Sequence, residues 1–298
     1  MKFFETLING FSIGGIYAMI ALGYTMVYGI AQMLNFAHGD IIMVGAYVII
    51  LFVPINPMLA IAAAIVFCAI FGIFIEKIAY KPLRGASPLA VLITAIGVSY
   101  LLQSLAQIIA GPTPKLNMLF EKLFPKFLEN HRGGIISIGS FNIKLSTVIT
   151  LACAIAVMVG LTLFVKKTKI GRAMVAVSED KGAAQLMGIN VNFIIMITFA
   201  IGSALAALAS TLMLMNGQKF AINMGSLPGI KAFTAAVIGG IGSIPGAMVG
   251  GIALGLIECF AQMIGLGEYT IAIEFSILIL VLLVKPTGIL GKKRREKV

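Results

Sequence analysis

Few residues in this chain have the type and spacing that acid–base or nucleophilic chemistry requires. The 298 residues include only two histidines, His38 and His131, and three cysteines that each stand alone in an apolar run. The sequence contains no H-E-x-x-H, no G-x-S-x-G and no G-x-x-x-x-G-K-[ST] phosphate loop. Residues 288–292 come nearest to such a loop but lack its spacing and its hydroxyl residue. We therefore expect no catalytic residue, no metal site and no ATP hydrolysis by this chain.

The segment Asn35-Phe36-Ala37-His38-Gly39-Asp40 places polar side chains between two apolar runs that only ten residues separate. A glycine and several polar groups so close to membrane depth favour a broken helix, whose freed backbone groups must line a cavity or be buried in protein. A short cytoplasmic turn with a solvated histidine and aspartate is the alternative. A broken helix would make Asn35, His38, Gly39 and Asp40 candidate residues of a pathway through the membrane.

Glu258 and Glu274 are ionisable residues inside apolar runs. A charge in a membrane-spanning helix usually faces the bundle interior or water, which makes Glu258 a further candidate for the pathway. The alternative for Glu258, as for Gln103 and Gln107, is a hydrogen-bonded contact between helices. Glu274 lies near the outer end of the last run, where we expect a solvated interfacial position. An ion-coupled carrier would need such residues in several spans, and only Asp40 joins these two glutamates as a candidate.

The composition shows that membrane-spanning helices must position these residues. Hydrophobic residues make up 60% of the chain and charged residues 11%, compared with roughly 25% charged in an ordinary soluble domain. At about 20 residues a span, the apolar residues suffice for about seven to nine helices. We predict an all-α, polytopic transmembrane bundle of about eight spans with broken or re-entrant helices, forming one domain over residues 1–298.

Apolar runs mark the predicted helices, and the second and seventh runs are too short to cross a membrane alone. The runs are Ile8–Ile30, Ile41–Val53, Leu59–Ile78, Leu89–Ile109, Ser146–Val165, Val191–Met215, Lys231–Ser243, Ala247–Ile264 and Tyr269–Val284. Small residues one helical turn apart, as in Gly242-x-x-x-Gly246-x-x-x-Gly250, predict close helix packing, either within the chain or at a subunit interface.

The basic residues indicate how the chain is oriented. The net charge is +11, and 14 of the 22 lysines and arginines lie in residues 76–88, in residues 166–190 and from Lys285 onward. Because basic residues remain preferentially on the cytoplasmic side, we expect the amino terminus and the loop 110–145 outside and the carboxyl tail inside. Basic residues in short connections form no nucleic-acid surface, so we expect no nucleic-acid partner, whereas the tail can contact anionic membrane lipid.

The segment from Glu179 to Asn190 has the pattern of a short cytoplasmic docking helix. Asp180, or Ser178 before it, can cap the helix, and Gly188 can end it. Three small or apolar residues share one face at three- and four-residue spacing: Ala183, Ala184 and Met187. An ordinary amphipathic interfacial helix is the alternative. A glutamate followed by two alanines and then a glycine resembles the loop by which ABC-importer permeases engage their ATPase subunits.

Four separated segments carry a more specific resemblance. They are Asn35-Phe36-Ala37-His38-Gly39 with Gly45-Ala46-Tyr47, Gly171-Arg172 with Ala183-Ala184-x-x-x-Gly188-Ile189-Asn190, Ala235-x-x-x-Gly239-Gly240-x-Gly242-Ser243-x-x-Gly246, and Lys285-Pro286-Thr287-Gly288-Ile289-Leu290-Gly291. Together, and in this order, they resemble the LivH-type permease subunit of branched-chain amino-acid ABC importers, through nearly the whole chain. Lys285 stands where an arginine is common in that family. Gly182 stands where a larger residue is common, and it could loosen the coupling helix.

The resemblance implies a function and a set of partners. The chain would carry leucine, isoleucine, valine or a related amino acid across the plasma membrane, and similar permeases for urea and short-chain amides are the alternative. The partners would be a second permease chain, two cytoplasmic ATPase subunits and an extracytoplasmic substrate-binding protein. The ATPase subunits would bind ATP and magnesium, and this chain would hold no cofactor. A stand-alone channel and an ion-coupled carrier are the alternatives outside the family.

By position, the resemblance also assigns residues to roles. Asn35 to Asp40 would be part of the translocation pathway. The ATPase coupling loop would consist of Glu179, Asp180, Ala183, Ala184, Met187 and Gly188 within the segment that ends at Asn190.

Overall fold

The computed structural model describes residues 2–33, 35–110, 135–138 and 141–291, and these residues are almost entirely helical. The helices are α1 (Lys2–Ala31), α2 (His38–Phe52), α3 (Pro57–Ile75), α4 (Pro88–Ala110), α6 (Leu145–Lys167), α7 (Lys169–Glu179), α8 (Lys181–Leu186), α9 (Val191–Met215), α10 (Ser226–Gly239), α11 (Ile244–Met263) and α12 (Thr270–Val284). Shorter helical segments are η1 (Glu76–Tyr80), η2 (Lys81–Leu83) and η3 (Gly267–Tyr269). Two strands, β1 (Ile135–Ile138) and β2 (Phe141–Lys144), form an antiparallel hairpin within the predicted outer loop, most of which lies outside the described residues. The predicted helical bundle is confirmed.

Seven of the described helices are long and apolar enough to cross a membrane. The helices α2 and α10 have 15 and 14 residues, which makes each about 21–22 Å long and too short for a hydrocarbon core of about 30 Å. The predicted short second and seventh runs are therefore confirmed. The predicted bounds of the seventh run, Lys231–Ser243, are wrong, because Gly240 and Gly242 adopt φ angles of +107° and +88° that end α10 earlier.

Two three-helix units run in opposite directions through the bundle. Each unit consists of a long helix, a half-length helix and a second long helix: α1, α2 and α3 in one, α9, α10 and α11 in the other. α1 and α9 are antiparallel, because Ser12 in the first half of α1 donates a hydrogen bond to Asn216 just after the end of α9, whereas Gly202 in the middle of α9 packs against Val27 near the end of α1. α2 packs on α3 and α9, just as α10 packs on α11 and α1. This arrangement is an inverted repeat, which the sequence does not reveal as a short internal repeat.

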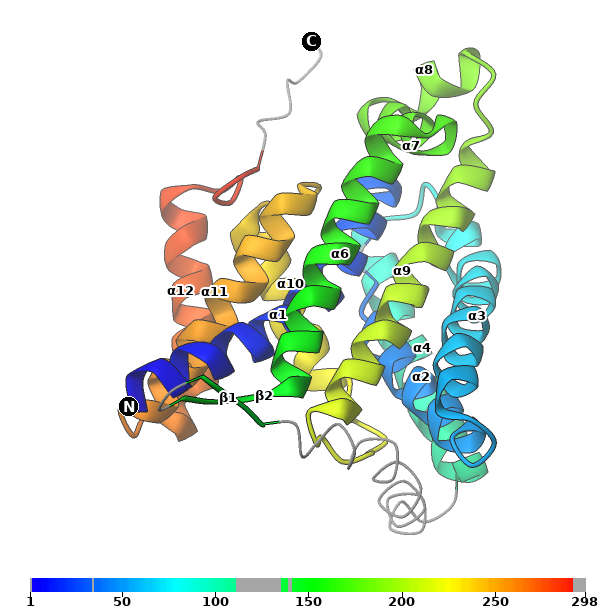
Figure 1. Ribbon diagram of the computed structural model, residues 1–298. Helices are drawn as coiled ribbons and strands as arrows, with labels where there is room; N and C mark the ends of the chain where they lie inside the picture. The colour runs from blue at the N-terminus through cyan, green and yellow to red at the C-terminus, as the bar shows by residue number, and fades with distance from the viewer. Residues whose placement is uncertain (1, 34, 111–134, 139–140, 292–298) are drawn as a thin grey trace.

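The basic connections between helices share one end of the bundle. Figure 1 shows α7 and α8 at one end, and the β1–β2 hairpin with the start of α1 at the other. At the α7–α8 end, the Lys181 side chain donates to the carbonyl of Ala31, the last residue of α1, over 2.9 Å. Arg84 also donates to Asn192 in the first turn of α9. The charge pattern therefore agrees with a single basic side of the bundle.

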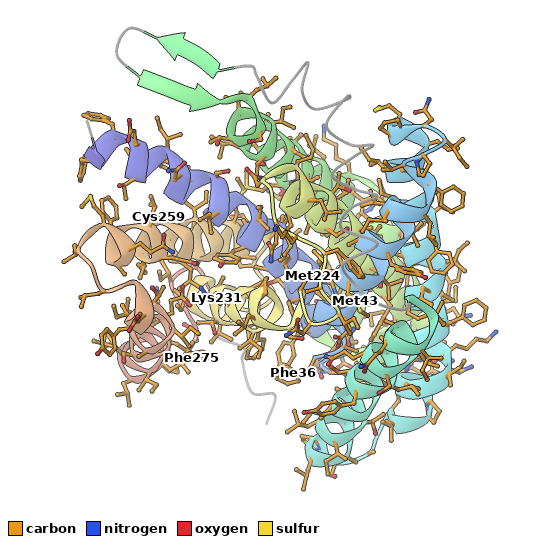
Figure 2. All side chains as sticks on the ribbon, turned by 90° about the horizontal axis from the view of Figure 1, so that it is seen from below. Phe36, Met43, Met224, Lys231, Cys259 and Phe275 are labelled. Atoms are coloured by element: carbon orange, nitrogen blue, oxygen red, sulfur yellow. The ribbon has the colours of Figure 1, made fainter. Side chains whose placement is uncertain are left out.

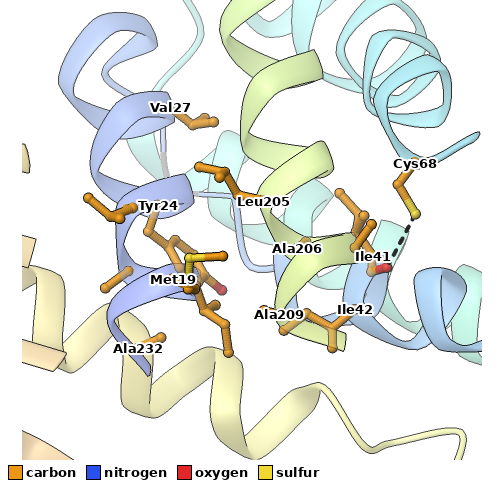
Figure 3. Packing of buried hydrophobic residues seen from close by; sticks show 14 of the residues in the cluster. Met19, Tyr24, Val27, Ile41, Ile42, Cys68, Leu205, Ala206, Ala209 and Ala232 are labelled. Atoms are coloured by element: carbon orange, nitrogen blue, oxygen red, sulfur yellow. Dashed lines mark hydrogen bonds between the residues drawn. The ribbon is translucent and has the colours of Figure 1, made fainter. Parts of the chain in front are cut away.

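α1 lies at the centre of the packing, in contact with α6, α9, α10 and α11. A Cβ atom at Gly14 would lie 2.7 Å from the Cα atom of Ile252, so glycine is required where α1 meets α11. The glycine stripe of α11 thus packs against α1 and α10. Of the two predicted roles, close packing within the chain or a subunit interface, the structure has the packing within the chain. Figure 3 shows Met19 of α1 and Leu205 of α9 in one buried cluster, with Cys68 of α3 directed at the carbonyl of Ile41. The three cysteines are free.

Candidate functional site

The two half-length helices meet at their amino-terminal ends inside the bundle. A Cβ atom at Gly39, in the first turn of α2, would lie 2.6 Å from the carbonyl oxygen of Gly225, the residue before α10. His38 packs against Gly23. Gly23 lies eight residues before the end of α1, which is about 12 Å along the helix axis from that end. The chain is thus broken at membrane depth on both sides of this crossing.

Asn35 and His38 are buried in protein at the break. The Asn35 side chain is 3% exposed, and its Oδ1 atom accepts a hydrogen bond of 2.8 Å from the hydroxyl of the fully buried Tyr80. The His38 ring is 1% exposed and meets the Tyr24 ring edge-on at 4.7 Å between centroids. The predicted broken helix is confirmed, and the alternative of a solvated cytoplasmic turn is wrong. The sequence allowed both because it gives no depth for the turn.

Asp40 joins the crossing to a third helix. Its carboxylate is buried and accepts a hydrogen bond of 2.8 Å from Gln103 Nε2 on α4. The same nitrogen lies 3.4 Å from the hydroxyl of Ser226, the first residue of α10. A carboxylate in the first turn of α2 is also favourable at the positive end of the helix dipole. Gln103, left open between two roles by the sequence, therefore makes a contact between helices that links both half-helices.

One face of α10 is left open beside the crossing. Leu227 and Ile230 are 55% and 39% exposed, although most of the helix is buried. Phe233, one turn further along, is half-buried and lies 5.7 Å from the Phe36 ring. Figure 2 shows α10 between α12 and α4, with Phe36 near the crossing. We call Phe36, Leu227, Ile230 and Phe233 the apolar strip.

The face of α10 next to the apolar strip carries an ionic cluster. Lys231 is 8% exposed, and its Nζ atom lies 2.9 Å from Glu258 Oε2 on α11 and 3.2 Å from Glu274 Oε1 on α12. The hydroxyl of Tyr17 on α1 donates a hydrogen bond of 2.7 Å to the same oxygen of Glu258. Of the two predicted environments for Glu258, the structure therefore has the contact between helices.

Two features of this cluster differ from the sequence analysis. The predicted solvated position of Glu274 is wrong, because its side chain is 1% exposed and faces Lys231. The position of Glu274 near the end of an apolar run does not show that a neighbouring helix covers its side chain. The sequence analysis does not identify Lys231 as a functional residue, because a single lysine at the start of an apolar run marks the boundary of that run. The signal for this role in the sequence is a single lysine in an apolar run, followed by one glutamate in each of the next two apolar runs.

The predicted coupling segment, Glu179 to Asn190, contains the last residue of α7, all of α8 and the connection to α9. Asp180 caps α8 by accepting a hydrogen bond of 2.9 Å from the Ala183 amide, and Gly188, with φ of +83°, follows its end, as predicted. The expected outward face is wrong in one residue, because Ala184 is only 4% exposed and faces the bundle. Leu186 and Met187 are instead 91% and 83% exposed. Helical spacing defines a face but does not show which face the protein covers.

A cavity lies between this segment and the end of α1. Its volume is about 810 Å³, and its lining includes Tyr28, Gln32, Arg84, Lys181, Gln185 and Asn192. Lys181 and Ala31, which a hydrogen bond joins, both line this cavity. The coupling segment is therefore attached to the central helix α1 as well as to α9.

The segment after α12 binds the carboxyl-terminal end of α10. The amides of Ile289 and Leu290 donate to the carbonyls of Ile238 and Gly239, over 2.8 and 2.9 Å. These are carbonyls that a helix end leaves without partners inside the helix. We call residues 285–291 the terminal clasp.

Among the residues that the structure describes, seven long apolar helices and two half-helices that meet at membrane depth define a multi-pass membrane transport protein with an inverted repeat. The chain belongs to the family described as branched-chain amino acid transport system, permease component, whose sequence profile matches residues 6–282.

Named relatives match nearly the full length of the chain. It is 43% identical to the high-affinity branched-chain amino acid transport system permease protein BraD of Pseudomonas aeruginosa, over 99% of this chain and 98% of the relative. It is 40% identical to the corresponding permease protein LivH of Escherichia coli, over 100% and 98%. A probable branched-chain amino acid transport permease protein of Methanocaldococcus jannaschii is 30% identical over 92% and 88%. No solved structure matches the chain.

Proposed function

We propose that this chain is the membrane-spanning subunit of an ABC importer for branched-chain amino acids in the plasma membrane. The observation that carries the proposal is the match of 40–43% identity over almost the whole chain to permease proteins of such systems. The absence of a phosphate loop from the sequence supports a subunit that does not hydrolyse ATP itself.

The pathway for the substrate follows the apolar strip. Phe36, Leu227, Ile230 and Phe233 offer aliphatic and aromatic surface at the level of the crossing. Such a surface suits the branched aliphatic side chains of leucine, isoleucine and valine. Behind the strip, the two half-helices are held together by Asn35, His38, Gly39 and Asp40. Glu258 contributes indirectly, by holding Lys231 of α10 in an ion pair.

The partners are a second permease chain, two cytoplasmic ATPase subunits and an extracytoplasmic binding protein. The α7–α8 end, which carries the basic connections, faces the cytoplasm, and the amino terminus lies outside. Coupling to the ATPase subunits occurs at Glu179, Asp180, Ala183, Ala184, Met187 and Gly188. Within this loop, the exposed Met187 and its neighbour Leu186 form the docking contact. ATP and magnesium are bound by the ATPase subunits.

Met187→Arg tests the coupling role. A charge at an exposed position leaves the fold of α8 intact but opposes docking in an apolar groove. We expect retained expression and partner-permease association, with loss of ATPase binding in pull-down and of ATP-driven uptake. Val175→Arg, also an exposed apolar residue but on α7, is the control and retains uptake. Normal uptake by Met187→Arg would contradict the assignment.

Reconstitution tests the whole function. Proteoliposomes with this chain, the second permease and the ATPase subunits are supplied with binding protein and either labelled leucine or labelled urea. We expect leucine uptake that requires internal ATP and all four kinds of subunit. Leucine uptake by this chain alone would indicate a channel, uptake that follows a proton or sodium gradient without ATP would indicate an ion-coupled carrier, and uptake of urea alone would indicate an amide permease. Each of these outcomes would overturn the proposal.

A further inference from the structure

The ionic cluster behind α10 has an unequal number of charges. Lys231 faces Glu258 and Glu274, and Tyr17 also touches Glu258. The side chains of Lys231, Glu258 and Glu274 are 10%, 14% and 1% exposed. One lysine can neutralise one carboxylate, and a second carboxylate without a cation is strongly unfavourable in a low-dielectric interior. Charge balance in the cluster therefore requires one further proton.

The surroundings of the two glutamates differ, and the difference shows where this proton belongs. Glu258 Oε2 is contacted by two donors, Lys231 Nζ at 2.9 Å and the Tyr17 hydroxyl at 2.7 Å. Neither oxygen of Glu274 has a hydrogen-bond partner among the residues that the structure describes. Its only contact with a charged donor in those residues is Lys231 at 3.2 Å, outside hydrogen-bond geometry. Glu274 is therefore the carboxyl group of the cluster whose negative charge no hydrogen-bond donor among the described residues compensates.

The cluster joins the half-helix of the pathway to the rest of the bundle. Lys231 is on α10, Glu258 on α11, Glu274 on α12 and Tyr17 on α1, so four helices meet at one lysine. α12 is otherwise loosely attached, since only a small share of its membrane-spanning stretch is buried. An excess negative charge here would weaken the junction between α10 and α12.

We propose that this cluster is a proton-binding site inside the membrane, in which Glu274 is protonated at neutral pH while Lys231 and Glu258 form an ion pair. The proton makes the cluster neutral and holds α10 against α11 and α12. This inference does not depend on which substrate the chain carries, or on whether it carries one.

Infrared spectroscopy of the purified full chain in lipid nanodiscs tests the site at neutral pH. The C=O stretch of a protonated carboxyl group is separate from carboxylate bands, and its shift in D₂O identifies it. We expect the difference spectrum, wild type minus Glu274→Gln, to show the loss of one such band. Glu268→Gln, an exposed glutamate just before α12, is the matched control and leaves the band unchanged.

Two further variants examine how the proton is shared. In Glu258→Gln, Glu274 becomes the sole carboxylate partner of Lys231, so we expect it to ionise and the band to disappear. In Lys231→Met, no cation is left for either glutamate, so we expect the band to double. Assembly of each variant is checked by size-exclusion chromatography, and Glu274→Gln, which is nearly isosteric, carries the test if another variant fails to assemble. An unchanged spectrum in Glu274→Gln would overturn the proposal, as would a spectrum that Lys231→Met leaves unchanged.

Discussion

The half-helices α2 and α10 begin at the same crossing but have different surroundings. α2 is covered by protein on nearly all sides. It is held by hydrogen bonds in which at most one partner is charged, from Tyr80 to Asn35 and from Gln103 to Asp40. α10 has one open apolar face, a buried lysine on the adjacent face and the terminal clasp at its end. Related positions in an inverted repeat thus have different surroundings, and in the proposed function α2 is the support and α10 the surface of the pathway.

Replacing the glycine at the crossing affects both half-helices and has the largest expected effect. Gly39→Leu must displace the backbone at Gly225, because even a Cβ atom lies 2.6 Å from its carbonyl oxygen. We expect a loss of about 3 kcal/mol or more of stability and no measurable uptake. Gly97→Leu is the control, since a Cβ atom there meets nothing within 4 Å. Thermal unfolding in detergent, together with uptake, measures both, and a stable Gly39→Leu protein would contradict the crossing.

A polar substitution in the apolar strip should affect transport without affecting stability. Ile230→Asn changes an exposed residue of α10, so the free energy of unfolding should stay within about 0.5 kcal/mol. We expect leucine uptake to fall about tenfold, because the substrate side chain loses apolar contact. Ile230→Val is the control with normal uptake. Equal loss of stability and uptake would instead place Ile230 in the supporting core.

The corresponding change on the α2 side should affect stability more than transport. Asn35→Leu leaves the buried Tyr80 hydroxyl without its acceptor, which costs about 1–3 kcal/mol. Uptake should fall only in proportion to the amount of folded protein. A variant of normal stability with strongly reduced uptake would show that Asn35 contacts the substrate.

The smallest expected effect comes from removing the donor of the same bond. Tyr80→Phe keeps the ring packed against Phe199, at 5.2 Å between centroids, and removes only the hydroxyl. We expect a loss of about 1 kcal/mol, measured by thermal unfolding, and unchanged uptake per folded molecule. Combined with Asn35→Leu, the losses should not add, because both variants break one bond.

The sequence predicted the helices well because length and hydrophobicity decide them almost locally. The short runs at α2 and α10, the Asp180 cap and the glycine after α8 all depend on neighbouring residues. The crossing of Gly39 with Gly225 could not be predicted, because it joins positions far apart in the sequence. Burial of Ala184 and Glu274 depends on which neighbouring helix covers them, and Lys231 has a role only beside partners on two other helices.

Thiol labelling tests most directly whether α10 lines the pathway and α2 supports it. The free residues Cys68, Cys153 and Cys259 are first replaced, and Ile230→Cys is compared with Met43→Cys, which is 1% exposed on α2. In the assembled transporter, we predict that a charged, membrane-impermeant thiol reagent labels Ile230→Cys, that leucine slows this labelling, and that Met43→Cys does not react. Labelling of Ile230→Cys only by a lipid-soluble reagent would place this face of α10 against lipid and would contradict the account.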